Sequence, residues 1–266
     1  MNTFQAFILG IVQALTEFLP ISSSAHLEII PWFFNWNNIP KSYDIALHFG
    51  TLLAIGIFFF KDWLNLIKAG FNNVLNKKTK EGNMFWYIVL ATIPGGIIGF
   101  ILDKKFENLK DFPLVIAIAL MVMGIVLYFV DKYSKSNVEY KNMTLKQTII
   151  IGISQALAFI PGVSRSGITT TTGRFLGVTR ESAARFSFML ATPITFAATV
   201  FKLNDFTSAI SEVGYLSFFV GILTSFVLGL FVIKFLLNYL KKGSFKVFAI
   251  YRVLIGITII IFLMIK

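Results

Sequence analysis

Apolar residues gather in long runs that alternate with short polar loops. Six runs are long enough to cross a membrane as a helix, which takes about 20 mostly apolar residues. They fall at roughly 44–60, 84–102, 113–130, 182–201, 215–237 and 246–265. The pattern therefore predicts an all-α integral membrane protein with six transmembrane helices.

Two further apolar stretches, residues 4–34 and 146–180, differ from these spans because each is interrupted. Each meets a proline, Pro20 or Pro161, and then runs through hydroxyl residues before the apolar pattern resumes. Broken backbone at membrane depth is tolerated only where protein or a wet cavity surrounds it. We therefore expect two re-entrant helical hairpins, each of which enters and leaves by one face.

The two hairpins also resemble each other. GIVQALTEFLPISSSAH (10–26) aligns without a gap with GISQALAFIPGVSRSGI (152–168), and seven positions are identical. Chance similarity between apolar, serine-rich stretches is the alternative, but the shared Gln and Gly favour a duplication. Because three spans follow each hairpin, the second half (140–266) would be inverted relative to the first (1–135). The sequence thus predicts one membrane domain built as an inverted-topology repeat, whose site forms near the midplane where broken helices meet.

Composition agrees with this assignment. Of all residues 56% are hydrophobic and only 14% are charged, whereas a soluble domain has about 25% charged residues. Cysteine is absent, which excludes disulfides and cysteine metal sites, and two histidines are too few for a multi-histidine metal site. No basic region precedes the first apolar run, so we expect the N-terminus to be retained rather than cleaved.

In a soluble protein the net charge of +11 would suggest binding to nucleic acid. Here the basic residues lie mostly in loops between spans, where they set the orientation of the protein in the membrane. We call the membrane face opposite the mouth of the first hairpin the basic face. The basic residues expected on or near it are Lys61, Lys68, Lys77, Lys78, Lys80, Lys132, Lys135, Lys141, Lys146, Arg174, Arg180, Arg185, Lys234, Lys241, Lys242 and Lys246. The opposite face holds Lys41, Lys104, Lys105, Lys110, Lys202 and Lys266. The basic face is therefore predicted to be cytoplasmic, with both termini and the mouth of the first hairpin outside.

The tip of the first hairpin carries several polar groups. Gln13 and Glu17 are four residues apart and share one helix face. Pro20 ends that helix, and the serines at 22–24 offer capping hydroxyls to a following half-helix that contains His26.

The second tip has a similar form. A break at Gly162 is followed by Ser164, Arg165 and Ser166, and then by a threonine run that begins at Thr169. Two half-helix N-termini would thus point towards each other. Their free N–H groups and positive dipole ends bind anions, and Arg165 adds a planar fork that suits phosphate oxygens.

Some of these residues have simpler explanations. Serines at helix starts are often only caps, threonines in membrane helices usually bond to their own carbonyls, and we expect His48 to be structural. Glu17 and Arg165 are different, because an ionisable group at mid-membrane costs about 2.5–3.5 kcal/mol on insertion scales and usually marks function. A structural Glu17–Arg165 ion pair is the alternative, although it would require neither His26 nor the serines.

A carboxylate, a hydroxyl, an imidazole, an arginine and two helix N-termini together suit attack on a phosphoryl group. No GxxxxGK[ST] loop is present, which argues against an NTPase. The segment GVSRS is not a nucleophile elbow, because Ser166 stands where G-x-S-x-G requires glycine.

These motifs resemble those of a known family. QALTEFLPISSSAHL (13–27) resembles the (E/Q)xxxE-FLP-[IV]-SS-x-x-H signature of the undecaprenyl-diphosphatase family, the bacitracin-resistance proteins. PGVSRSGITTTTGRFLG (161–177) is similar to that family's second motif, PGxSRSxxT. Two further segments look like family segments, FSFMLATPI (186–194) and FAIYRVLIG (248–256). The likeness therefore covers nearly the whole chain.

The resemblance implies hydrolysis of undecaprenyl diphosphate to the monophosphate carrier lipid and inorganic phosphate, aided by Mg²⁺ or Ca²⁺. It implies carrier recycling for cell-wall synthesis, bacitracin resistance, and a location in the bacterial cell membrane. The functional positions of the family carry over onto Gln13, Glu17, Ser22, Ser23, His26, Ser164, Arg165, Ser166 and Thr169. Position 13 is Gln where many members have Glu, so a metal site with two carboxylates is not implied.

Our mechanistic hypothesis takes Ser23 as nucleophile and His26 as base, with attack by His26 itself or by a water it activates as the competing routes. Arg165 and the helix N–H groups would bind the terminal phosphate, and Glu17 would hold the cation. The expected partners are a polyprenyl diphosphate, which enters from the outer side, and membrane lipids; no nucleic acid is expected, and a homodimer is left open.

Two other functions fit parts of the pattern. Inverted repeats with broken helices are transporter architecture, so the chain could move an anion or flip a phosphorylated lipid. A structural membrane subunit is the third class, and it leaves the Glu17 and Arg165 charges unexplained.

Overall fold

The structure is a computed structural model that describes residues 1–36, 39–75, 79–106 and 112–265. Four lysines that entered the charge count lie outside the described residues: Lys77, Lys78, Lys110 and Lys266. The side chains of Lys104 and Lys105 lie outside the description as well.

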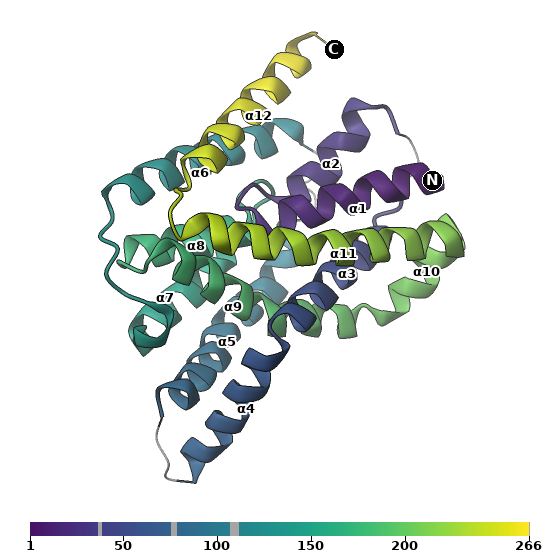
Figure 1. Ribbon diagram of the computed structural model, residues 1–266. Helices are drawn as coiled ribbons and strands as arrows, with labels where there is room; N and C mark the ends of the chain where they lie inside the picture. Colours follow the sequence, from purple (N-terminus) through teal and green to yellow (C-terminus); the bar gives the residue numbers. More distant parts are fainter. Residues whose placement is uncertain (37–38, 76–78, 107–111, 266) are drawn as a thin grey trace.

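Helices dominate the described chain, and no strand occurs in it, which confirms the all-α expectation (Figure 1). The α-helices are α1 (Thr3–Phe18), α2 (Ser23–Phe33), α3 (Tyr43–Phe58), α4 (Phe60–Val74), α5 (Lys80–Phe106), α6 (Pro113–Tyr133), α7 (Leu145–Ser154), α8 (Arg165–Phe175), α9 (Arg180–Phe201), α10 (Leu203–Val213), α11 (Tyr215–Leu240) and α12 (Lys246–Ile265). Two short 3-10 helices, η2 (Tyr140–Asn142) and η3 (Gln155–Phe159), complete the set.

Five helices of the described chain are long and apolar enough to cross a membrane. They are α5, α6, α9, α11 and α12, and they coincide with five of the six predicted spans. The remaining span, expected at 44–60, is broken: α3 ends at Phe58, and α4 continues at an angle of 69°. The two helices make a sixth span only if the bent pair is counted as one.

Two segments expected to be connecting loops contain helices instead. Residues 61–83 include most of α4, and residues 202–214 include α10. Each helix places a narrow set of small or apolar residues against the bundle, such as Leu66 and Gly70 in α4 and Ala209 in α10. Because polar residues interrupt such a narrow apolar stripe along the sequence, it does not form the continuous apolar run that identifies a span. The hydrophobic pattern therefore did not predict these two helices.

Both interrupted stretches fold as broken helix pairs. In each, the chain turns at a serine with positive φ, 77° at Ser22 and 74° at Ser164. The hydroxyl of each serine caps the next helix by accepting the N–H of Ala25 or Gly167. The aligned serines Ser22 and Ser164 thus have the same backbone turn and the same capping role.

The two breaks meet inside the bundle. Figure 1 shows α1 and α2 on the right of the view and α7 and α8 on the left. The hydroxyl of Ser166, in the first turn of α8, donates to the carbonyl of Leu19 just after α1, at 3.2 Å. Segments 147 residues apart in the sequence are therefore joined.

A buried ion pair fixes the far end of α8. Asp131, at the end of α6, accepts hydrogen bonds from Nε of Arg174 at 2.9 Å and from Nε of Arg180 at 2.8 Å. It also accepts the backbone N–H of Phe245 before α12, at 3.1 Å. Because the side chain of Arg174 is only 1% exposed, this pairing offsets the cost of burying its charge.

Candidate active site

The central contact of the candidate site joins the two breaks. Glu17, in the last turn of α1, forms an ion pair through Oε1 with Nη2 of Arg165, the first residue of α8. The carboxylate is 7% exposed and the guanidinium side chain 22%. An isolated charge at this depth would be strongly disfavoured, so each group stabilises the charged form of the other.

Ser23, the first residue of α2, contacts the other carboxylate oxygen. Its hydroxyl donates to Oε2 of Glu17 at 2.6 Å. A short hydrogen bond from a hydroxyl to a carboxylate is the geometry in which the carboxylate can accept the proton of an attacking nucleophile.

Gln13 and His48 complete the surroundings of the carboxylate. Nε2 of Gln13 donates to Oε2 of Glu17 at 3.3 Å and lies 2.9 Å from Nδ1 of His48. That same His48 nitrogen is 3.6 Å from Glu17 Oε2. His48, which the sequence predicts to be structural, therefore lies beside the site residues, because α3, which carries it, packs beside α1. The local sequence does not reveal this contact.

His26 is oriented towards α12 rather than towards Ser23. Its Nδ1 lies 2.7 Å from the carbonyl oxygen of Ser22, and because a carbonyl only accepts, Nδ1 carries a proton. Its Nε2 lies 2.8 Å from the hydroxyl of Tyr251. Both ring nitrogens are therefore engaged with groups other than the Ser23 hydroxyl.

The guanidinium of Arg165 has a second partner. Nη1 donates to the hydroxyl of Thr195 on α9 at 2.6 Å. Thr169 supports the same helix start, because its hydroxyl donates to the carbonyl of Arg165 and pairs with Ser187 on α9, each at 2.7 Å. The arginine fork is thus held between α1 and α9.

The other residues selected from the sequence have distinct positions. Ser22 and Ser164 are the N-caps of α2 and α8. The hydroxyl oxygen of Ser166 lies 3.2 Å from that of Ser164. These residues shape the helix starts. Because α2 and α8 both begin at the site, their first N–H groups and positive dipole ends add to the charge of Arg165.

Sequence reasoning missed two neighbouring residues of α12, although it quoted the segment that contains them. Tyr251 contacts His26. Arg252 is completely buried and donates to the carbonyls of Pro20 and Gly162, one at each break. For Arg252 a signal was present, because a charged residue inside the 246–265 span usually marks function. The sequence does not show which groups Tyr251 and Arg252 contact.

The site contains oxygen atoms that could ligate a divalent cation. Oε1 of Gln13 is buried and accepts no hydrogen bond within the described chain. Gln13 and Glu17 therefore offer one amide oxygen and one carboxylate group. Among the described residues, no cluster of three His, Cys, Asp or Glu that could hold a metal ion occurs. Mg²⁺ is commonly held by one or two protein oxygens together with substrate phosphates and water, so this donor set fits.

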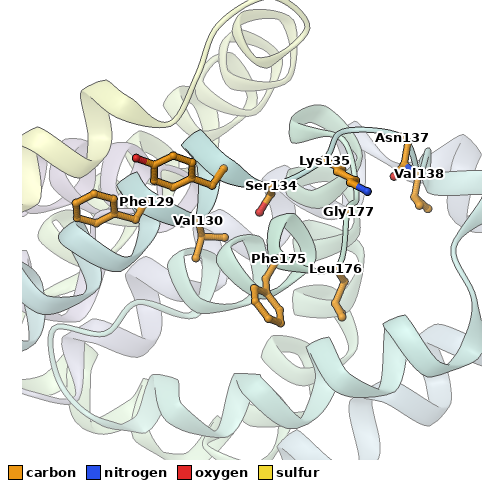
Figure 2. A pocket seen from close by; sticks show the side chains of 10 residues that line it. Phe129, Val130, Ser134, Lys135, Asn137, Val138, Phe175, Leu176 and Gly177 are labelled. Atoms are coloured by element: carbon orange, nitrogen blue, oxygen red, sulfur yellow. The ribbon is translucent and has the colours of Figure 1, made fainter.

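Two cavities lie away from these residues. The first, about 740 Å³, separates the end of α6 from the end of α8; Figure 2 shows Phe129 and Val130 on one side and Phe175 and Leu176 on the other. The second, about 580 Å³, is lined by charged residues that include Arg185. The lining of neither includes a residue of the Glu17 site.

Comparison with known proteins places the chain in a family. Residues 6–258 match the family described as Bacitracin resistance protein BacA. An undecaprenyl-diphosphatase of Pelotomaculum thermopropionicum is 46% identical over 98% of this chain and 97% of its own length. Proteins of the same name from Desulforudis audaxviator and Gemmatimonas aurantiaca are 44% and 45% identical, over 100% and 97% of each chain. Since these matches include both hairpins and the helices around them, the chain belongs to the bacitracin resistance protein BacA family.

Proposed function

We infer that this protein is a membrane phosphatase that hydrolyses undecaprenyl diphosphate to undecaprenyl phosphate and inorganic phosphate. Full-length similarity to relatives named undecaprenyl-diphosphatase supports the reaction. By this reaction the protein recycles the carrier lipid for cell-wall synthesis and confers bacitracin resistance. The observation that carries the chemical assignment is the contact of one carboxylate, Glu17, with both a hydroxyl and a guanidinium, those of Ser23 and Arg165.

Substrate binding follows from the charges at the breaks. The diphosphate lies between the starts of α2 and α8, where backbone N–H groups and Arg165 bind its terminal phosphate. When phosphate oxygens take over the guanidinium, Oε1 of Glu17 loses that partner, while Oε2 keeps its contact with the Ser23 hydroxyl and accepts its proton. The prenyl chain extends into the surrounding bilayer.

Ser23 attacks the terminal phosphorus while Glu17 accepts its proton. The bond from that phosphorus to the bridging oxygen breaks, and undecaprenyl phosphate leaves with the electron pair. Water then attacks the phosphorus of the phosphoserine, and the bond from that phosphorus to the Ser23 oxygen breaks. Glu17 returns its proton to the Ser23 oxygen, and both protons of the water leave with inorganic phosphate. Arg165 stabilises the charge that develops on the equatorial oxygens.

The contacts of His26 favour a different role from the base that the sequence hypothesis assigned. A carboxylate 2.6 Å from the nucleophile is better placed than an imidazole that contacts Ser22 and Tyr251. His26 positions the first turn of α2. Direct attack by water with Glu17 as base is the competing route, and it predicts no phosphoserine in a quenched reaction.

Glu17 and Gln13 would hold the divalent cation, Mg²⁺ or Ca²⁺. When bound, it would screen the negative charge of the diphosphate. The amide of Gln13 supplies an uncharged oxygen, so the two residues would give the ion one negative charge from the protein.

The topology proposal keeps the inverted repeat of halves 1–135 and 140–266, with α3 and α4 together as the sixth span. The identical serine caps at the two breaks support it. In Figure 1 the start of α1 and the end of α12 lie towards the upper right, and the end of α4 and the start of α5 lie at the lower left, as expected if the termini and the site mouth face outward. A homodimer stays a prediction from the sequence.

Phosphate release by the purified protein in detergent tests the function. With a long-chain polyprenyl diphosphate we expect release that a chelator abolishes and that Mg²⁺ or Ca²⁺ restores. The rival transporter needs two compartments and no bond cleavage, so it predicts no phosphate under these conditions. Absence of release by folded protein with cation present would contradict the proposed reaction.

A further inference from the structure

Arg252 of α12 is a buried cation that binds backbone carbonyls. Its side chain is 0% exposed. Nη1 donates to the carbonyl of Pro20 at 2.9 Å, and Nη2 donates to those of Gly162 and Val163 at 2.8 and 2.9 Å. Nε donates to the carbonyl of Leu120 on α6 at 3.3 Å. Within the described chain, every hydrogen bond of this guanidinium goes to an uncharged acceptor.

Three of these acceptors belong to the two breaks. Pro20 follows the end of α1, and Gly162 and Val163 follow the end of η3. Carbonyls beyond a helix end lack a helical partner, and inside a membrane water does not replace it. A single side chain therefore satisfies both breaks and fixes their separation.

The same guanidinium lies against the start of α8. A Cβ added at Gly167 would lie 2.8 Å from Nη1 of Arg252, and Gly167 is only two residues after Arg165. Carbonyl partners do not cancel the positive charge, and charges act over longer distances where the dielectric constant is low. A diphosphate at the helix starts would experience this charge in addition to that of Arg165.

We propose that Arg252 is a positioning residue of the active site, which holds the two breaks in register and adds positive charge to the diphosphate pocket. The proposal rests on the proposed function. It separates two contributions: the hydrogen-bonding fork sets the geometry between Ser23 and Arg165, and the charge strengthens phosphate binding.

Two substitutions separate these contributions. Arg252→Lys keeps the charge but cannot reach both breaks with one planar group, so we expect kcat to fall by about 10²-fold, as for a misplacement of about 1 Å. The KM for the polyprenyl diphosphate and inhibition by inorganic phosphate should stay near the wild-type values. Arg252→Met loses both, so kcat should fall at least as far, with KM and the phosphate inhibition constant each raised about tenfold or more.

Arg174 provides a matched control, because it is also a buried arginine but pairs with Asp131 at the far end of α8. Arg174→Met should lower the thermal stability of the detergent-solubilised protein and leave the KM and phosphate inhibition of the folded fraction unchanged. A purely structural role for Arg252 predicts the same behaviour for Arg252→Met.

The outcomes separate this proposal from the function it rests on. If wild-type protein releases no phosphate, the proposed function fails. If wild-type protein is active and folded Arg252→Met keeps its kcat and KM, the positioning role is wrong. If Arg252→Lys and Arg252→Met share the same KM and phosphate inhibition, the charge contribution is wrong.

Discussion

At the scale of single residues, the candidate site depends on which atoms contact the Glu17 carboxylate. Ser23 and Arg165 bind its two oxygens, and Gln13 bonds to the oxygen that Ser23 contacts. The sequence pattern identified all of these residues, because each lies within one of the two long motifs that contain the breaks. It did not give the role of His26, since which group a ring nitrogen meets depends on α12.

Removal of the Ser23 hydroxyl tests the proposed role of this residue as nucleophile. We expect Ser23→Ala to lower phosphate release more than about 10³-fold, because side chains that form a covalent intermediate carry effects of that size. Ser24→Ala, one residue along the same turn, should stay within about threefold of wild type. Size-exclusion profiles check that both variants fold, and wild-type turnover by Ser23→Ala would eliminate this residue as the nucleophile.

His26 gives a second prediction at this scale. Its ring bonds to Tyr251 and to a carbonyl, so its loss should reduce the rate about fivefold, the effect of a lost hydrogen bond of about 1 kcal/mol. Tyr251→Phe, which keeps the ring and removes the hydroxyl, should have a similar effect. If His26→Ala abolished turnover as completely as Ser23→Ala, the imidazole would have to act in the chemistry.

At the scale of elements, prolines and serine-rich turns made the broken helices predictable. The breaks after Phe18 and Phe159 and the helix starts at Ser23 and Arg165 follow from residues that cannot continue a helix or that cap a new one. The helices α4 and α10 were missed because their apolar stripes are narrow. Contacts from α3, α9 and α12 were also missed, since which helices pack on a hairpin is a property of the tertiary structure.

The close packing of α8 on Arg252 makes a prediction about glycine. At Gly167 an added Cβ would lie 2.8 Å from the Arg252 guanidinium, so Gly167→Ala must move one of the two. Because Arg165 is in the same turn, we expect a rate loss of about 10²-fold. Gly96→Ala on α5, where an added Cβ meets nothing within 4 Å, is the control and should keep wild-type activity. Equal activity of the two variants would show that this contact does not set the site.

At the scale of the whole molecule, loop charge predicts the orientation. The absence of cysteine permits single-cysteine labelling in intact cells with an impermeant maleimide. Lys202→Cys, between α9 and α10, should be labelled from outside, and Lys135→Cys, between α6 and α7, only after the cells are opened. Labelling of position 135 in intact cells would reverse the proposed orientation and place the site mouth on the inner side.

The whole account requires that the two hairpins form one site rather than two independent ones. A double-mutant cycle on phosphate release measures this directly, with Glu17→Asp and Arg165→Lys chosen to retain measurable activity. Groups that act together are strongly non-additive. We therefore predict that the double variant loses far less than the product of the two single losses. If the activity loss of the double variant equals the product of the two single losses to within about twofold, Glu17 and Arg165 act independently. That result would contradict the proposed site at the meeting of the hairpins.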